Sequence, residues 1–176
     1  MENIGFFGGD LRIVKLAELF SKNGYEVYTY GLEEAKFKKR NIRNTTLEKV
    51  IENTNIIFGS IPFSKDNEEI FSPFSRLKLN IKEIFPKIKN KKFITGAINE
   101  KFIEIAKKYD IEIIDILENE ELATLNAIPT AEGAIQVAME QTEFTIHNSK
   151  CLILGFGRIG KILTKMLLRN GGKRFM

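Results

Sequence analysis

Short apolar runs alternate along the chain with amphipathic segments, and this alternation limits the possible fold more than any other feature of the sequence. Amphipathic segments at residues 11–22 and 99–109 carry apolar side chains at helical spacing, and a shorter one at 47–52 follows Thr46. Strands that alternate with helices predict a parallel sheet between two layers of helices. The predicted fold class is therefore α/β, a flavodoxin- or Rossmann-like three-layer parallel sheet. The apolar runs lie at residues 4–7, 26–30, 55–59, 92–96 and 112–116.

A complete G-x-G-x-x-G pattern directly follows the apolar run Cys151–Leu154. In a strand–turn–helix, its three glycines allow a tight turn, the close approach of a pyrophosphate, and close packing of the helix on the strand. The start of a helix also offers free N–H groups to phosphates. The pattern therefore predicts a binding site for the cofactor NAD or NADP. Its residues are Gly155, Phe156, Gly157, Arg158, Ile159 and Gly160.

The pattern lies near the end of the sequence, so we expect only the first strand and helix of a second Rossmann domain, with no further strand before Met176. The expected domains are a flavodoxin-like domain over residues 1–128, a connecting helix and linker over 129–149, and an incomplete NAD(P)-binding domain over 150–176. A single strand cannot cover its own apolar faces. We therefore expect this chain to be truncated and to have little or no catalytic activity by itself.

The first predicted strand ends in Gly8-Gly9-Asp10-Leu11-Arg12, at the sheet edge where open α/β folds bind ligands. Two hypotheses stay open here. In the first, a substrate site is formed by the Gly8 and Gly9 amides, Asp10 and Arg12, and the Arg12 guanidinium binds a carboxylate through two hydrogen bonds. In the second, Asp10 caps the next helix and Arg12 extends into solvent. Pro62 ends another strand at this edge and is assigned to the same cleft, although a proline after a strand is commonly only a turn.

Polar residues surround Pro129, just before the expected connector. Leu122–Ile128 is expected to be extended, and Thr130 to begin a helix that ends near residue 141. Asn126 and Thr130 are candidate substrate-binding residues, and Glu132 is the candidate catalytic residue for proton transfer. The alternative gives Thr130 a helix-capping role and leaves Glu132 as a favourable charge in the first turn.

Composition excludes several classes of protein. The net charge is +4 and the isoelectric point about 9.1, but the basic residues are scattered among acidic ones, so no nucleic-acid partner is predicted. No apolar stretch is long enough to span a membrane, and the N-terminus lacks the pattern of a signal peptide. The single cysteine, Cys151, excludes an internal disulfide, and the single histidine, His147, has no partners for a metal site.

Taken in order along the chain, these segments resemble the family of dipicolinate synthase A subunits. The most specific part is the segment Leu125–Glu140, which contains Asn-Ala-Ile-Pro-Thr-Ala-Glu-Gly-Ala. Each shorter motif is generic, whereas the series is specific. The other matching parts are Gly8-Gly9-Asp10 with Arg12, Pro62, Ser72–Ser75, Thr145–Lys150 and Leu154–Arg158.

The resemblance implies a flavodoxin-like N-terminal domain followed by a Rossmann domain akin to those of 2-hydroxyacid dehydrogenases. It implies an NAD(P)-dependent oxidoreductase that, with a flavoprotein-like B subunit, converts the product of dihydrodipicolinate synthase into dipicolinate. The expected location is the cytoplasm of the mother cell of a spore former. The substrate would then be a small dicarboxylate.

Two other functions stay open. The chain is alternatively a non-catalytic module that docks a partner protein, since the apolar strand Cys151–Leu154 offers an unpaired edge. It is alternatively a different dehydrogenase of the same layout, acting on a 2-hydroxy acid or an amino acid. A homo-oligomer is compatible with each of these hypotheses.

Overall fold

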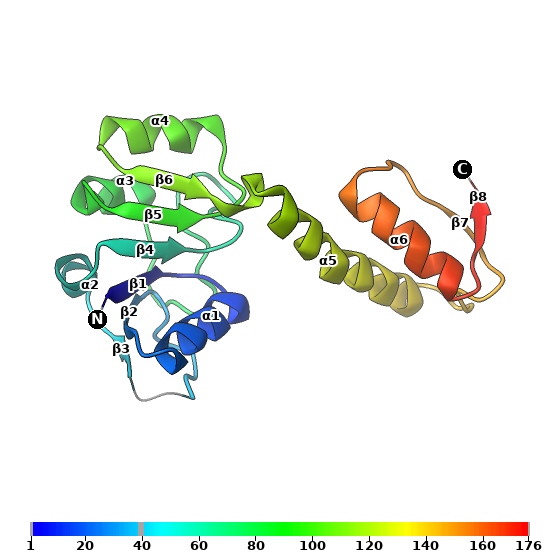
Figure 1. Ribbon diagram of the computed structural model, residues 1–176, viewed down its shortest axis with the longest axis horizontal. Helices are drawn as coiled ribbons and strands as arrows, with labels where there is room; N and C mark the ends of the chain where they lie inside the picture. Colours follow the sequence, from blue (N-terminus) through cyan, green and yellow to red (C-terminus); the bar gives the residue numbers. More distant parts are fainter. Residues whose placement is uncertain (1, 39–40, 176) are drawn as a thin grey trace. The chain divides into compact units, whose positions relative to one another are not determined.

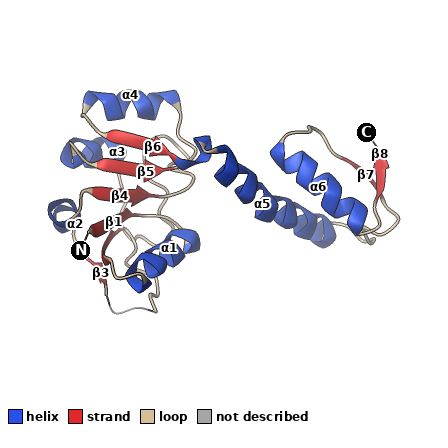
Figure 2. Ribbon diagram, viewed as in Figure 1, coloured by secondary structure: helices blue, strands red, loops and turns tan. Residues whose placement is uncertain are grey.

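The chain folds as an α/β protein in which strands and helices follow the predicted alternation (Figures 1 and 2). The computed structural model describes residues 2–38 and 41–175. They form two compact units, unit 1 within residues 1–116 and unit 2 within residues 117–176. Both contain parallel strands joined by helices, which confirms the predicted fold class. Because these units are defined by internal contacts, the expected domain boundary at residue 128 stays a prediction.

Unit 1 is built on a six-stranded sheet in which all neighbouring strands are parallel. The order is β3-β2-β1-β4-β5-β6, which reverses direction between β1 and β4. This is the Rossmann order, and without the short edge strand β3 it is the flavodoxin order. Ligands of such sheets bind beside the carboxyl ends of the strands at the reversal. The strands are β1 (Asn3–Phe7), β2 (Glu26–Tyr30), β3 (Ile42–Asn44), β4 (Ile56–Gly59), β5 (Lys92–Thr95) and β6 (Glu112–Asp115).

Alternate side chains of the strands enter two separate hydrophobic cores, one on each face of the sheet. Phe6 belongs to the core beneath α1 (Leu11–Lys22), whereas Phe7 belongs to the core on the opposite face. The second core is larger and contains the rings of several phenylalanines. The elements that cover it are α2 (Leu47–Asn53), α3 (Ile81–Ile84), the 3-10 helix η1 (Phe85–Ile88) and α4 (Glu100–Lys108).

Polar side chains begin the helices of unit 1, and for Asp10 this capping role was one of the two hypotheses from the sequence. Asp10 at α1, Thr46 at α2 and Asn99 at α4 each accept a hydrogen bond from a backbone N–H of the first turn. Each bond satisfies one of the N–H groups that a helix start leaves without a partner. In unit 1, the elements β3, α3 and η1 were not predicted, because a three-residue strand and single helical turns are too short to show a hydrophobic period.

Unit 2 combines two packed helices with a two-stranded sheet. After the 3-10 helix η2 (Ile116–Glu118), α5 (Glu120–Gln141) packs against α6 (Arg158–Arg169). The strand β7 (Lys150–Leu152) pairs in parallel with β8 (Lys173–Phe175), so β7, α6 and β8 form a βαβ unit. The predicted strand and helix after residue 150 are confirmed.

The expectation that no second strand follows α6 is wrong. Asn170 caps the end of α6, and Gly171, at φ 78°, turns the chain back. The amide of Gly172 then donates to the carbonyl of Leu167, and β8 begins directly afterwards. The sequence did not show β8 because only three residues pair with β7. Met176, the expected end of the unpaired segment, lies outside the described residues.

The expected extended segment before Pro129 is also wrong. The helix α5 begins at Glu120 behind the N-cap Asn119, so Leu122–Ile128 is helical and Pro129 lies inside the helix. A proline there cannot donate to the carbonyl of Leu125 four residues earlier, which normally breaks a helix. The N-cap Asn119 and the packing of α5 on α6 offset this cost. Sequence analysis identified neither of them, because it took the proline as the boundary of the helix.

Replacing Pro129 by alanine is expected to raise the free energy of unfolding of unit 2 by about 1–3 kcal/mol, because it restores a helical N–H donor at an exposed position. Chemical denaturation followed by circular dichroism measures the change. The exposed Thr124→Ala on the same helix serves as the control, with an expected gain of less than about 0.7 kcal/mol. Equal effects of the two substitutions would contradict the cost assigned to the proline.

Candidate functional site

The turn between β7 and α6 has the geometry expected of the three glycines. Gly155 has a φ of 98°, a left-handed conformation that few other residues adopt. A Cβ built on Gly160 would lie 2.3 Å from the carbonyl oxygen of Gly155, so only glycine lets α6 approach the turn this closely. A Cβ built on Gly157 meets nothing within 4 Å, which leaves open space beside the start of the helix. The tight turn and the close packing are therefore confirmed, and the open side is where a ligand can approach.

The start of α6 is not closed by a side chain. Its N-cap is Gly157, and no side-chain hydrogen bond satisfies the first turn. A cavity of about 550 Å³ lies at this point. Free N–H groups at a helix start, next to an open cavity, suit an anionic group such as a pyrophosphate. The residues around the cavity are Ile153, Leu154, Gly155, Gly157, Arg158, Ile159, Gly160 and Leu163.

A smaller cavity in unit 2 brings two groups of predicted residues together. It has a volume of about 190 Å³ and is lined by Asn126 and Thr130 of α5 and by Arg158 and Ile159 of α6, among others. Arg158 thus borders both this cavity and the one at the glycine turn. Its Nη1 atom lies 3.5 Å from Oε2 of Glu120 in the first turn of α5. No local pattern indicated that α5 and α6 would meet here, because this depends on how the helices pack.

Thr130 and Glu132 do not have the helix-start roles that were considered for them. Both lie well inside α5, so neither Thr130 as a cap nor Glu132 as a first-turn charge is correct. The Thr130 hydroxyl donates to the backbone carbonyl of Asn126 at 2.9 Å. Glu132 is exposed and lines neither cavity. Two residues along a helix correspond to about 200° of rotation, so Glu132 points away from the side of α5 that carries Thr130.

The candidates of unit 1 lie together at the reversal of strand order, but most of their polar groups are already engaged. The amide of Gly8 donates to the carbonyl of Tyr30 and that of Gly9 to the carbonyl of Phe71, both at 2.9 Å. These two amides are therefore not available to an anion in this structure, which corrects that part of the first hypothesis. The bonds arise because β2 and the loop after β4 pack against the turn, which the local sequence does not show.

Asp10 and Arg12 bind one another. The Asp10 carboxylate caps α1 through the amide of Arg12 and also accepts from its guanidinium, with Nη2 to Oδ2 at 2.8 Å. Burial alone would raise the pKa of the Asp10 carboxyl, but the hydrogen bonds and charge of Arg12 outweigh it and hold that pKa below its usual value. Arg12 also donates to the carbonyl of Ile61, next to Pro62. The guanidinium thus links the ends of β1 and β4 and stays largely exposed.

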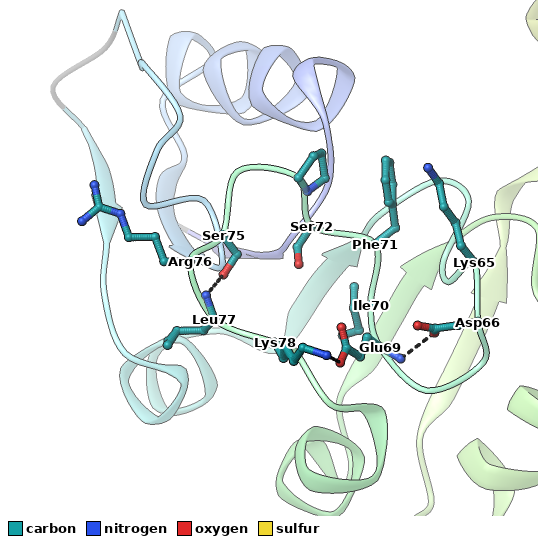
Figure 3. Close-up of a pocket in the computed structure, with 11 residues that line it drawn as sticks. Lys65, Asp66, Glu69, Ile70, Phe71, Ser72, Ser75, Arg76, Leu77 and Lys78 are labelled. Carbon is teal, nitrogen blue, oxygen red and sulfur yellow. Dashed lines mark hydrogen bonds and ion pairs between the residues drawn. The ribbon is translucent and has the colours of Figure 1, made fainter.

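A third cavity, of about 350 Å³, lies within the loop that follows β4 and was not predicted as a site (Figure 3). Its charged groups are engaged by neighbouring groups: Lys78 contacts Glu69 at 3.0 Å, and Lys65 lies 4.1 Å from the centre of the Phe71 ring. The Asp66 carboxylate accepts two backbone N–H groups of the same loop. These contacts hold the loop in place. The sequence showed only its polar, proline-containing composition.

Two kinds of site are not found in the part of the chain that the structure describes. No group of three or more His, Cys, Asp or Glu side chains is arranged to hold a metal ion. None of the described helices combines the length and the apolar character that a membrane crossing requires.

The matching family model and the relative described next point to the same family. The family of N-terminal domains of the dipicolinate synthase A subunit matches residues 3–117. The A subunit of dipicolinate synthase from Bacillus subtilis (strain 168) is 22% identical over 171 residues, which cover 96% of this chain and 58% of that protein. The chain therefore spans less than two thirds of the length of this relative.

Two solved structures have a fold similar to that of this chain. The crystal structure of the dipicolinate synthase A chain from Bacillus subtilis has a TM-score of 0.79 at 20% identity, covering 97% of this chain and 58% of that one. The A subunit of dipicolinate synthase from Bacillus halodurans has a TM-score of 0.84 at 23% identity, covering 98% and 60%. At 20% and 23% identity, these structures support a shared fold. The match to the family model supports the relationship of this chain to dipicolinate synthase A subunits.

Proposed function

The chain belongs to the family of N-terminal domains of dipicolinate synthase A subunits, and we therefore propose that it is part of an NAD(P)-dependent oxidoreductase. The proposed reaction is the oxidation of the dihydrodipicolinate synthase product to dipicolinate during sporulation, in the cytoplasm of the mother cell. A flavoprotein-like B subunit is the proposed partner. We propose this activity for the whole protein and expect little turnover from these residues alone, because they span only 58% of the length of the Bacillus subtilis relative.

The single observation that carries the proposal is the geometry of the glycine turn. Gly155 forms the turn, and Gly160 lets α6 pack closely against that turn. The open side of Gly157 lies at the start of α6, which no side chain caps. These features fit a dinucleotide whose pyrophosphate accepts hydrogen bonds from the first N–H groups of α6. When bound, the nicotinamide ring would accept a hydride from the substrate. The same features serve NAD and NADP equally.

The proposed substrate residues receive unequal support. Asn126 and Thr130 line a cavity beside the glycine turn, which favours a role in binding a small dicarboxylate. In unit 1 the proposal rests on Arg12, because the amides of Gly8 and Gly9 already have acceptors. Glu132 remains the proposed proton-transfer residue on the chemistry of its carboxyl group alone.

A second candidate function is the docking of a partner protein. Leu154 and Phe156 are 89% and 60% exposed, and Leu152 of β7 is 68% exposed. Apolar side chains beside a short sheet are a common feature of surfaces that bind another chain. The two functions are compatible in one protein.

Direct titration tests the proposed function. NADH and NADPH are added separately to the 176-residue chain, and the nucleotide fluorescence is followed, since the chain has no tryptophan of its own. Saturable binding of at least one of them is expected, and adenosine, which lacks phosphates, should not compete. Absence of saturable binding for both nucleotides would reject the dinucleotide site and leave the docking function as the leading proposal.

A further inference from the structure

The small cavity between α5 and α6 has the composition of a carboxylate-binding site. Leucine, alanine and isoleucine side chains form most of its wall, and Asn126, Thr130 and Arg158 are its polar residues. Pockets for small molecules commonly combine an apolar wall with a few polar groups that fix the orientation of the ligand. The complete lining is Leu117, Ala123, Asn126, Ala127, Thr130, Arg158 and Ile159.

The polar groups of this cavity are mainly donors. Arg158 supplies a guanidinium, whose planar fork matches the two oxygens of a carboxylate. Within residues 2–38 and 41–175, the side-chain amide nitrogen of Asn126 makes no hydrogen bond, so its two N–H groups are available. Thr130 donates its own hydroxyl proton to the Asn126 carbonyl, which leaves its oxygen as an acceptor. A guanidinium beside a free amide favours an anion with a planar pair of oxygens.

The contact between Arg158 and Glu120 is a weak one. The two charged atoms are 3.5 Å apart, and the side chains of Arg158 and Glu120 are 49% and 82% exposed. Exposed ion pairs of this kind contribute little, because water and salt screen them and both side chains lose freedom. Arg158 therefore has a carboxylate partner that a ligand in the cavity can displace at small cost.

We infer that this cavity binds a carboxylate group of a small dicarboxylate, with Arg158 and Asn126 as the donors and Glu120 as an internal competitor for Arg158. The inference rests on the proposed function and deepens it, because it moves Arg158 from the cofactor to the substrate. A ligand carboxylate takes the place of the Glu120 carboxylate on the guanidinium, and no covalent bond changes.

The test measures the binding of dipicolinate to the 176-residue chain by isothermal titration calorimetry, with and without saturating NADH or NADPH. Saturable binding is expected, and pyridine-2,6-dicarboxamide, which has the same shape and no charge, should not bind. The variant Asn126→Asp places a negative charge in the cavity, and it is expected to weaken dipicolinate binding at least about tenfold. Because Asn126 does not line the cavity at the glycine turn, dinucleotide binding should be weakened much less than dipicolinate binding.

Two controls separate the site from the general effect of charge. Thr124→Asp adds the same charge to an exposed position of α5 away from the cavity, and it should leave dipicolinate binding unchanged. Glu120→Gln removes the competitor and should strengthen dipicolinate binding by about two- to fivefold. Glu121→Gln removes the neighbouring charge, which has no ion pair within the described residues, and should have no such effect.

The outcomes distinguish this inference from the proposed function. If a dinucleotide binds but dipicolinate does not, or if Asn126→Asp and Thr124→Asp weaken dipicolinate binding equally, the carboxylate site is rejected and the dinucleotide site stands. If neither ligand binds, both proposals are rejected. If Asn126→Asp weakens the binding of both ligands equally, the cavity belongs to the cofactor and the inference is wrong.

Discussion

A variant with Gly160 replaced by alanine is expected to bind NADH at least about tenfold more weakly than the parent protein. The added Cβ would lie 2.3 Å from the carbonyl oxygen of Gly155, a backbone atom that cannot rotate away. Either the turn opens or α6 moves outward, and forcing an atom into a packed site costs about 1–3 kcal/mol. The helix start would then no longer present its N–H groups in the same position. Fluorescence titration measures the affinity, and chemical denaturation measures the loss of stability.

Two other glycine-to-alanine variants serve as controls. Gly133 lies in α5, and an added Cβ meets nothing within 4 Å, so alanine should leave NADH binding unchanged and stabilise the helix by up to about 1 kcal/mol. A Cβ on Gly157 also meets no protein atom, yet it occupies the open side of the turn. Gly157→Ala should therefore weaken binding, with a loss of stability of no more than about 1 kcal/mol from alanine at the N-cap of α6. NADH binding by the Gly160 variant at the parent affinity would show that the turn is not the site.

Replacing Phe63 by alanine is expected to lower the free energy of unfolding of unit 1 by about 3–5 kcal/mol. Phe63 is fully buried although it lies just beyond the end of β4. Its ring centre lies 4.7 Å from that of Phe102, 5.6 Å from that of Phe93 and 5.7 Å from that of Phe85. Truncation removes all three ring contacts and leaves a cavity that the sheet and helices cannot close. Denaturation in urea, followed by circular dichroism, measures the change.

The matched control is Phe144→Ala, which removes the same ring from a side chain that is 69% exposed. This variant should change the free energy of unfolding by less than about 0.5 kcal/mol. A loss of less than about 1 kcal/mol in the Phe63 variant would contradict the role given to this ring.

Most helices and strands of this protein follow from patterns that span only a few residues. The runs at 26–30, 55–59 and 92–96 became β2, β4 and β5, and the predicted helix 11–22 is α1 with the same ends. Side-chain period and N-caps act between residues within one or two turns, so they can be recognised without knowing the rest of the chain. The same holds for the turn and packing roles of Gly155 and Gly160.

Longer-range packing decided the features that sequence analysis missed. Pro129 predicts a break, but the contact of α5 with α6 keeps the helix continuous through it. The strand β8 is only three residues long and is defined by its pairing with β7, not by any pattern of its own. In both cases the decisive partner lies many residues away along the chain.

The α/β class, most element boundaries and the glycine turn could be predicted from the sequence, because each depends on interactions between near neighbours. Which polar groups are free could be learned only from the folded chain. Folding engaged the amides of Gly8 and Gly9 with distant carbonyls, and it joined Asn126 and Arg158 at one cavity while leaving Glu132 outside. A hydrogen-bonding group is available to a ligand only if no other part of the folded chain reaches it first, and that depends on packing between segments far apart in the sequence.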